Sequence, residues 1–200
     1  LPGAEFDYPR VSTPSRSVLE SHLANLEGSK YAYAVSCGMA CLDVIMRLVR
    51  PGECVIAGDD LYGGSNRLLE LLKKQMHIEV DNIDTTDLVA VEQALQQRAK
   101  AHAAGEGARV ALVLLESPTN PMIKIADLAG CTRLVRKYIP EALVVVDNTM
   151  LSPYLMRPLE FGVDIVYHSA TKYLSGHHDI MAGVISCNRD ALAESMFFTI

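Results

Sequence analysis

Seven short segments rich in valine and isoleucine alternate along this chain with segments of helical periodicity. These segments are apolar at nearly every position rather than at every second one, which is typical of strands covered by helices on both faces. The alternation therefore predicts an α/β fold with a mostly parallel, seven-stranded sheet between helices. The predicted strands are residues 31–35, 54–57, 78–80, 110–115, 143–146, 165–167 and 184–187.

The segments between the strands carry signals for the starts and ends of helices. Ser17 and Glu20 have the spacing of a capping box and Gly28 follows as a stop, so we expect the first helix between them. The leucines of this helix, Leu19, Leu23 and Leu26, share one face. Further helices are predicted over residues 39–49, 67–76, 87–98 and 128–138, and an exposed loop over residues 100–109.

Length and composition limit the classes of function. A chain of 200 residues, half of them hydrophobic, can bury one sizeable core, so we expect one domain or the main part of one. The net charge of -6, without a block of Lys or Arg, argues against nucleic acid or an anionic membrane as a partner. The longest apolar runs are far shorter than the ~20 residues that cross a bilayer. The five scattered cysteines predict a reducing compartment, which we take to be the cytoplasm, with peroxisome and plastid as alternatives.

Residues with useful chemistry follow several predicted strands, where ligands collect in open α/β sheets. Gly38 and Met39 open a helix whose unpaired N–H groups suit a phosphate. Tyr62, followed by two glycines, can lie against a flat ligand, and Asp147 ends a buried strand. Lys172 lies among hydroxyl groups after another strand, where partial burial would favour a nucleophilic amine. Phosphate donors, an aromatic ring, a carboxylate and a Schiff-base lysine are together what pyridoxal 5'-phosphate requires.

Each of these residues also has an interpretation without a function. Alone, Lys172 would be a solvated loop lysine, and Asp147 would cap a turn at a strand end. His177, His178 and Asp179 resemble a metal-binding cluster, but adjacent histidines on a loop lack the i,i+4 geometry of a helical zinc site, so we expect no metal. The chain contains neither a GxGxxG segment after a strand nor a P-loop, which argues against a dinucleotide or nucleoside triphosphate site.

Five motifs together resemble a known family. They are SCGMA, DDLYGG, ESPTNP, VVVDNTMLSP and SATKYLSGHHDIMAG. They are similar, in the same order, to motifs of the cystathionine lyase and synthase family of transsulfuration enzymes, and the likeness spans residues 8 to about 188. The resemblance implies a pyridoxal-phosphate enzyme of fold type I, the aspartate-aminotransferase type. Residues 31–200 would be its cofactor-binding large domain, after an N-terminal segment at residues 1–30, while the family's C-terminal small domain has no counterpart in this sequence.

The resemblance implies a role for residues around the cofactor ring. Lys172 would form the Schiff base, and Asp147 would pair with the pyridine nitrogen. Tyr62 would stack on the ring and act on the substrate's amino group or on the leaving sulfur, and Asn120 would lie near the ring edge. The substrate would be a sulfur amino acid, and the arginine that grips its carboxylate in this family would come from the C-terminal domain.

The resemblance also implies how the phosphate is held. The groups concerned are the amides of Gly38 and Met39 and the hydroxyls of Ser169 and Thr171. Tyr8 and Arg10 match a Tyr-x-Arg motif that reaches the phosphate of the neighbouring subunit, which implies a homo-oligomer, usually a tetramer built as a dimer of dimers. Three positions depart from the family's pattern: Ser12 in place of Asn, Cys37 in place of Ser, and His178 in place of Ser.

The implied reaction is β-elimination of L-cystathionine to homocysteine, pyruvate and ammonia in methionine biosynthesis. The runs GDDLYGGSNRLL, RPLEFGVDIVYHSATKYLSGH and DIMAGV look most like the eukaryotic β-lyases of the family. Cystathionine γ-lyases, cystathionine γ-synthases and methionine γ-lyases share the cofactor residues and stay open as alternatives. An alternative of another class is a fragment that binds pyridoxal phosphate without catalysing a reaction.

Overall fold

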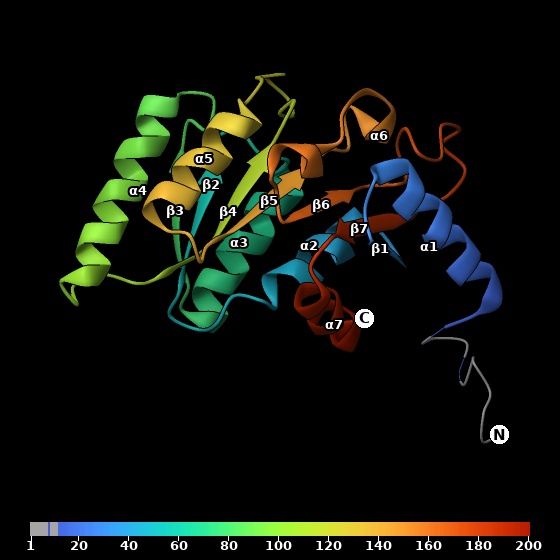
Figure 1. Cartoon of the computed structure of the whole chain (residues 1–200), viewed down its shortest axis with the longest axis horizontal. Helices are drawn as coiled ribbons and strands as arrows, with labels where there is room; N and C mark the ends of the chain where they lie inside the picture. Colours follow the sequence, from blue (N-terminus) through green and yellow to red (C-terminus); the bar gives the residue numbers. More distant parts are fainter. Residues whose placement is uncertain (1–7, 9–11) are drawn as a thin grey trace.

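The computed structural model describes residue 8 and residues 12–200, and it confirms the predicted α/β fold (Figure 1). The strands are β1 (Tyr31–Val35), β2 (Cys54–Gly58), β3 (Glu79–Ile83), β4 (Val110–Glu116), β5 (Leu143–Asp147), β6 (Ile165–His168) and β7 (Gly183–Cys187). The helices are α1 (Pro14–Glu27), α2 (Gly38–Met46), α3 (Gly63–Met76), α4 (Leu88–Ala103), α5 (Leu128–Tyr138), α6 (Ser152–Leu155), the 3-10 helix η1 (Pro158–Phe161) and α7 (Asp190–Thr199).

All seven strands form one sheet in the order β1-β7-β6-β5-β4-β2-β3. The pairs from β3 through β6 are parallel, whereas β7 runs antiparallel to both β6 and β1. Only β7 is therefore reversed, and the carboxyl ends of β1, β2, β4, β5 and β6 lie at one edge of the sheet. This edge collects the loops in which the chemically active residues were predicted.

Two hydrophobic clusters cover the two faces of the sheet. One cluster joins the sheet to α2, α3 and α7, and the other joins it to α4 and α5 on the opposite side (Figure 1). Along β4, Leu112 and Leu114 belong to the first cluster, and Val113 and Leu115 belong to the second. This division explains why the central strands are apolar at every position.

The first helix differs from its prediction at its start. It begins at Pro14, because the hydroxyl of Thr13 accepts the Arg16 N–H at 3.1 Å and proline suits the first turn. The capping box predicted at Ser17 is therefore wrong, and the Glu20 carboxylate instead accepts the Ala34 N–H at 2.9 Å. Of the three leucines that share one face, Leu19 and Leu26 are exposed and Leu23 packs against a small buried cluster, and the buried residues of the helix are Ala24 and Glu27.

The remaining boundaries differ from prediction mainly at the periphery. Strand β3 covers 79–83 rather than 78–80, since an edge strand is only half covered and its sequence is not continuously apolar. Helix α3 starts at Gly63 rather than at residue 67, and α2 ends at Met46 rather than at residue 49. Helix α4 continues to Ala103, so the predicted loop at 100–109 is helical in its first part. Gly28 ends α1 as predicted, with a φ of 68° that favours glycine.

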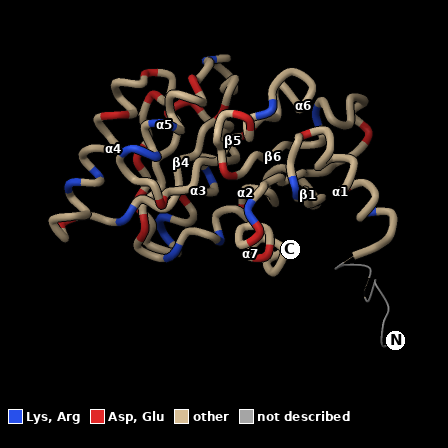
Figure 2. The backbone as a smooth tube through the Cα atoms, in the orientation of Figure 1, with Lys and Arg blue, Asp and Glu red and all other residues tan. Residues whose placement is uncertain are grey.

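Charged residues of both signs are interspersed along the chain (Figure 2). Several of them join neighbouring elements, for example Arg136, whose guanidinium lies 2.6 Å from the Asp164 carboxylate. Among the residues that the structure describes, none lies in a helix both long and apolar enough to cross a membrane.

Candidate active site

A pocket of about 540 Å³ opens at the carboxyl edge of the sheet. It brings together eight of the ten residues predicted from the sequence to form the site: Gly38, Met39, Tyr62, Asn120, Asp147, Ser169, Thr171 and Lys172. Tyr8 is described and half exposed, and it is not among the lining residues. Arg10 lies outside the described residues.

One end of the pocket is formed by the start of α2. Gly38 is the first residue of this helix, and the thiol of Cys37 caps it by accepting the Ala40 N–H at 3.4 Å. The cysteine thus takes over a capping role that a serine hydroxyl could perform. A Cβ at Gly38 would lie 2.8 Å from the Cβ of Ser169, so glycine is required for the two segments to approach. The helix N-terminus and Ser169 together form an end of the pocket suited to an anion.

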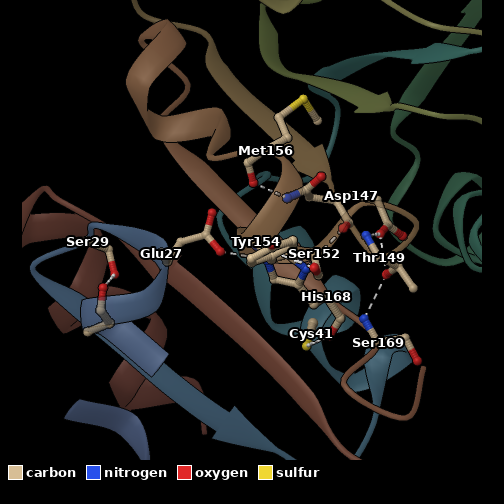
Figure 3. A network of polar contacts seen from close by, with 12 residues as sticks. Glu27, Ser29, Cys41, Asp147, Thr149, Ser152, Tyr154, Met156, His168 and Ser169 are labelled. Carbon is tan, nitrogen blue, oxygen red and sulfur yellow. Dashed lines mark hydrogen bonds and ion pairs between the residues drawn. The ribbon is translucent and has the colours of Figure 1, made fainter. Parts of the chain in front are cut away.

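A chain of hydrogen bonds links Asp147 to the segment that carries Ser169 (Figure 3). The Thr149 hydroxyl donates to Asp147 at 2.5 Å and accepts the Ser169 N–H at 2.8 Å, and the Thr149 N–H also donates to Asp147 at 2.9 Å. Burial raises the pKa of Asp147, and the bonds from Thr149 oppose that rise. Thr149 was not predicted as a site residue, although a threonine two residues after a strand-end aspartate is a signal for such a turn.

Tyr62 lines the pocket and is 50% exposed. A Cβ at Gly64 would lie 2.5 Å from Cε1 of this ring and 2.9 Å from the sulfur of Met39. A Cβ at Gly63 would meet nothing within 4 Å. Of the two glycines predicted to admit the ring, only Gly64 therefore has that function.

Lys172 lines the pocket but its side chain is exposed, so the partial burial expected from its sequence context is wrong. Its segment is held by backbone bonds, with the Lys172 N–H donating to the Ser169 carbonyl at 3.1 Å. The hydroxyl of Thr171 donates to the carbonyl of Ala182 at 3.2 Å and accepts its N–H at 3.1 Å. His178, which departs from the family's pattern, lies at the same pocket with a φ of 55°.

Glu116 is a buried carboxylic acid in the pocket wall that sequence reasoning missed. It ends β4 and is 4% exposed, and its strand pairs in register with Asp147. Its carboxylate accepts the N–H of Tyr62 at 2.9 Å and the N–H of Asn120 at 2.7 Å. Burial raises its pKa from 4.5 to about 7, and the nearby charge of Asp147 adds to the rise. Its position directly after an apolar strand was a signal, but the sequence suggested only a polar turn there.

Residues 2–200 match the family described as Cys/Met metabolism PLP-dependent enzyme. This chain belongs to that family. The match covers nearly the whole chain, and it confirms the resemblance drawn from the motifs.

Similar proteins include cystathionine beta-lyases from two fungi. The one from Schizosaccharomyces pombe is 50% identical over 196 residues, which are 98% of this chain and 47% of the relative. The one from Neurospora crassa is 50% identical over 198 residues, which are 99% of this chain and 41% of the relative. A crystal structure of cystathionine gamma-lyase from Lactobacillus plantarum, complexed with L-serine, matches with a TM-score of 0.88 and 33% identity over 99% of this chain and 49% of that one. The chain spans about half the length of the curated relatives that it matches.

Pyridoxal phosphate is the cofactor of this family, and the pocket fits it. A carboxylate for the pyridine nitrogen, a helix N-terminus for the phosphate and a lysine amine line one cavity. Because Gly38 has no Cβ, the start of α2 can pack against Ser169. Because Gly64 has no Cβ, the Tyr62 ring can pack against the start of α3.

Proposed function

We propose that the protein containing this chain is a carbon–sulfur lyase that cleaves L-cystathionine by β-elimination to homocysteine, pyruvate and ammonia, as a step of methionine biosynthesis. The proposal is supported by 50% identity, over nearly the whole chain, to relatives named cystathionine beta-lyase. It is also supported by the single pocket that Lys172, Asp147 and Tyr62 line together. Bound pyridoxal phosphate would supply the electron sink for the charge that develops at the substrate's Cα.

Four residues of the pocket would then bind the cofactor ring and transfer protons. Lys172 would hold the cofactor through its amine and, when released, would take the proton from the substrate's Cα. The Asp147 carboxylate would keep a proton on the pyridine nitrogen, as a buried anion beside a base does. Tyr62 would lie against the ring and face the substrate's amino group or the leaving sulfur, with Asn120 at the ring edge.

The phosphate would be held by the amides of Gly38 and Met39 and by the hydroxyls of Ser169 and Thr171. A dianion at a helix N-terminus is stabilised by the unpaired N–H groups and the helix dipole. We also propose that Tyr8 and Arg10 reach the phosphate of a neighbouring subunit in a homo-oligomer, a tetramer built as a dimer of dimers. Sedimentation of the full-length protein would test the tetramer, and a monomer would contradict it.

The keto acid formed from L-cystathionine distinguishes β-cleavage from γ-cleavage. Pyruvate is expected from the full-length protein, whereas 2-oxobutyrate would indicate a γ-lyase. That alternative has support in a human cystathionine gamma-lyase that is 36% identical over 193 residues. Lys172→Ala should abolish product formation, and Lys73→Ala, which changes an exposed lysine of α3, should leave it intact. Turnover retained by the Lys172 variant would contradict the assignment of this residue.

A fragment that binds the cofactor without catalysis is the second candidate, because the chain spans about half the length of its relatives. Incubating the 200-residue chain alone with cofactor and cystathionine tests this candidate, and turnover would exclude it. We further propose a cytoplasmic location, which the five free cysteines of the chain support. Fractionation of the source cells would test it.

A further inference from the structure

Glu116 occupies a position where two loops of the pocket meet. It is the last residue of β4, which lies between β2 and β5 in the sheet. One oxygen of its carboxylate accepts the Tyr62 N–H from the loop after β2, and the other accepts the Asn120 N–H from the loop after β4. Both bonds go to backbone amides, so they set the paths of the loops rather than the rotamers of single side chains.

We propose that Glu116 is a positioning residue that clamps these two loops and so fixes where Tyr62 and Asn120 stand at the cofactor. The proposal rests on the cofactor site proposed above, but it concerns contacts that exist within the chain itself. With 4% of its surface exposed, Glu116 forms its two bonds away from water, where a charged acceptor is strongest.

A second, outer contact joins the same loops nearer to the surface. The Asp60 carboxylate accepts the Met122 N–H at 3.1 Å, and Lys124 lies 3.2 Å from the Asp59 carboxylate. These contacts are exposed, so water competes for them. The inner clamp at Glu116 and the outer contact at Asp60 can be removed separately. Asp60 is a matched control at pH 8, where Glu116 is ionised whether or not the Asp60 charge is present.

The charges around Glu116 make its clamp sensitive to pH. Asp147 on β5, Asp60 on the loop after β2 and Tyr167 on β6 act on it electrostatically, and Lys172 lines the same pocket. Burial, together with repulsion from Asp147 and Asp60, raises the pKa of Glu116 to about 7. Above that pH the carboxylate is ionised and accepts both amides strongly. Below it the neutral acid is a weaker acceptor, so the loops should loosen.

Amide hydrogen exchange of the full-length protein, followed by mass spectrometry, tests the clamp without depending on turnover. At pH 8, Glu116→Gln should lower the protection of the Tyr62 or Asn120 amide roughly tenfold or more, because the side-chain amide of glutamine cannot accept both bonds. Asp60→Ala should lower protection at Met122 only. The same variants are compared for cofactor affinity by absorbance titration, where Glu116→Gln should bind pyridoxal phosphate roughly tenfold more weakly and Asp60→Ala should bind it as the wild type does.

The pH dependence of amide protection in the wild type provides a second test, which does not depend on the folding of a variant. After correction for intrinsic exchange rates, protection of Tyr62 and Asn120 in the wild type should fall as the pH drops through about 7. In Glu116→Gln it should be independent of pH. Glu116→Asp, one methylene shorter, should keep protection at one of the two amides. The proposal would be overturned by unchanged amide protection in Glu116→Gln at pH 8, or by wild-type protection that does not change with pH. A protein that fails to cleave cystathionine would contradict the proposed function, but the exchange measurements would still test the clamp.

Discussion

At the scale of single residues, the hydroxyl of Thr149 connects two residues that line the pocket, Asp147 and Ser169. It donates to the Asp147 carboxylate and accepts the Ser169 N–H, so one oxygen fixes both a carboxylate and the loop that follows β6 (Figure 3). The same bond lowers the pKa of Asp147 against the effect of burial. Thr149, which was not predicted as a site residue, thus lowers the pKa of the predicted site residue Asp147.

Thr149→Val should therefore raise the pKa of Asp147 further, because valine has the shape of threonine but no hydroxyl. We expect the free energy of unfolding to fall by about 1–2 kcal/mol and the affinity for pyridoxal phosphate to fall roughly tenfold. Urea denaturation and absorbance titration measure the two effects. Thr149→Ser, which keeps the hydroxyl, is the control, and equal affinities in the two variants would disprove this role.

At the scale of elements, the start of α2 and the segment after β6 approach as closely as their backbones permit. An alanine Cβ at Gly38 would lie 2.8 Å from Cβ and 3.0 Å from Cα of Ser169, and part of that contact is to backbone. Gly38→Ala should therefore push the helix from the loop, destabilise the fold by about 1–3 kcal/mol and weaken cofactor binding.

Gly63→Ala is the matched control, because Gly63 also opens a helix but a Cβ there would meet nothing within 4 Å. This substitution should be neutral or stabilise by a few tenths of a kcal/mol, since alanine is the better helix former. Thermal denaturation of both variants measures the difference. Equal losses of stability would show that the close approach at Gly38 is unimportant.

A second contact between elements fastens α1 to the sheet next to the pocket. Glu27 at the end of α1 lies 2.8 Å from Nε2 of His168 at the end of β6, and the other ring nitrogen lies 3.1 Å from the Asn148 carbonyl (Figure 3). Both side chains are almost fully buried, with 1% and 2% exposed. Because His168 directly precedes Ser169, α1 supports the loop that carries the predicted phosphate contacts.

Glu27→Ala should destabilise the fold by about 2 kcal/mol or more, since it leaves the buried imidazole without this partner. Hydrogen exchange should quicken first in α1. The control is Glu70→Ala, which removes an exposed pair with Lys73 at 2.8 Å and should leave stability essentially unchanged. A Glu27 variant as stable as the Glu70 variant would contradict the fastening role.

At the scale of the whole molecule, two large hydrophobic clusters pack on opposite faces of one sheet. Leu114 and Leu115 are neighbours in β4 with no exposed surface, yet they belong to the clusters on opposite faces. Both faces of the sheet are covered at β4, so both leucine side chains are buried although they point in opposite directions.

Leu114→Ala and Leu115→Ala should each lower the free energy of unfolding by about 2–5 kcal/mol, because each leaves a cavity in a packed core. In a sheet with one solvated face, only one of two successive residues would show such a loss. Leu71→Ala, at a position 45% exposed on α3, should cost much less. Urea denaturation measures all three variants, and a small loss for either β4 variant would contradict the two-sided core.

The sequence predicted the bounds of the strands more accurately than it predicted the first helix. The central strands were predicted within one residue because burial on both faces makes them apolar throughout. The start of α1 was predicted wrongly, because the Glu20 carboxylate accepts the N–H of Ala34 in β1, a contact between α1 and the sheet that the capping-box spacing does not encode. Eight of the predicted site residues line one pocket because each follows a strand or forms part of a contiguous motif.

The sequence by itself determined the α/β class, the places of the strands and the residues that follow them, since these depend on neighbours along the chain. Only the tertiary structure decided that β7 is reversed between β1 and β6, that Glu116 holds the amide of Tyr62, and that Glu27 meets His168. The last two pairs are 54 and 141 residues apart. No local pattern encodes such contacts, because they follow from strand order and the packing of α1 on the sheet.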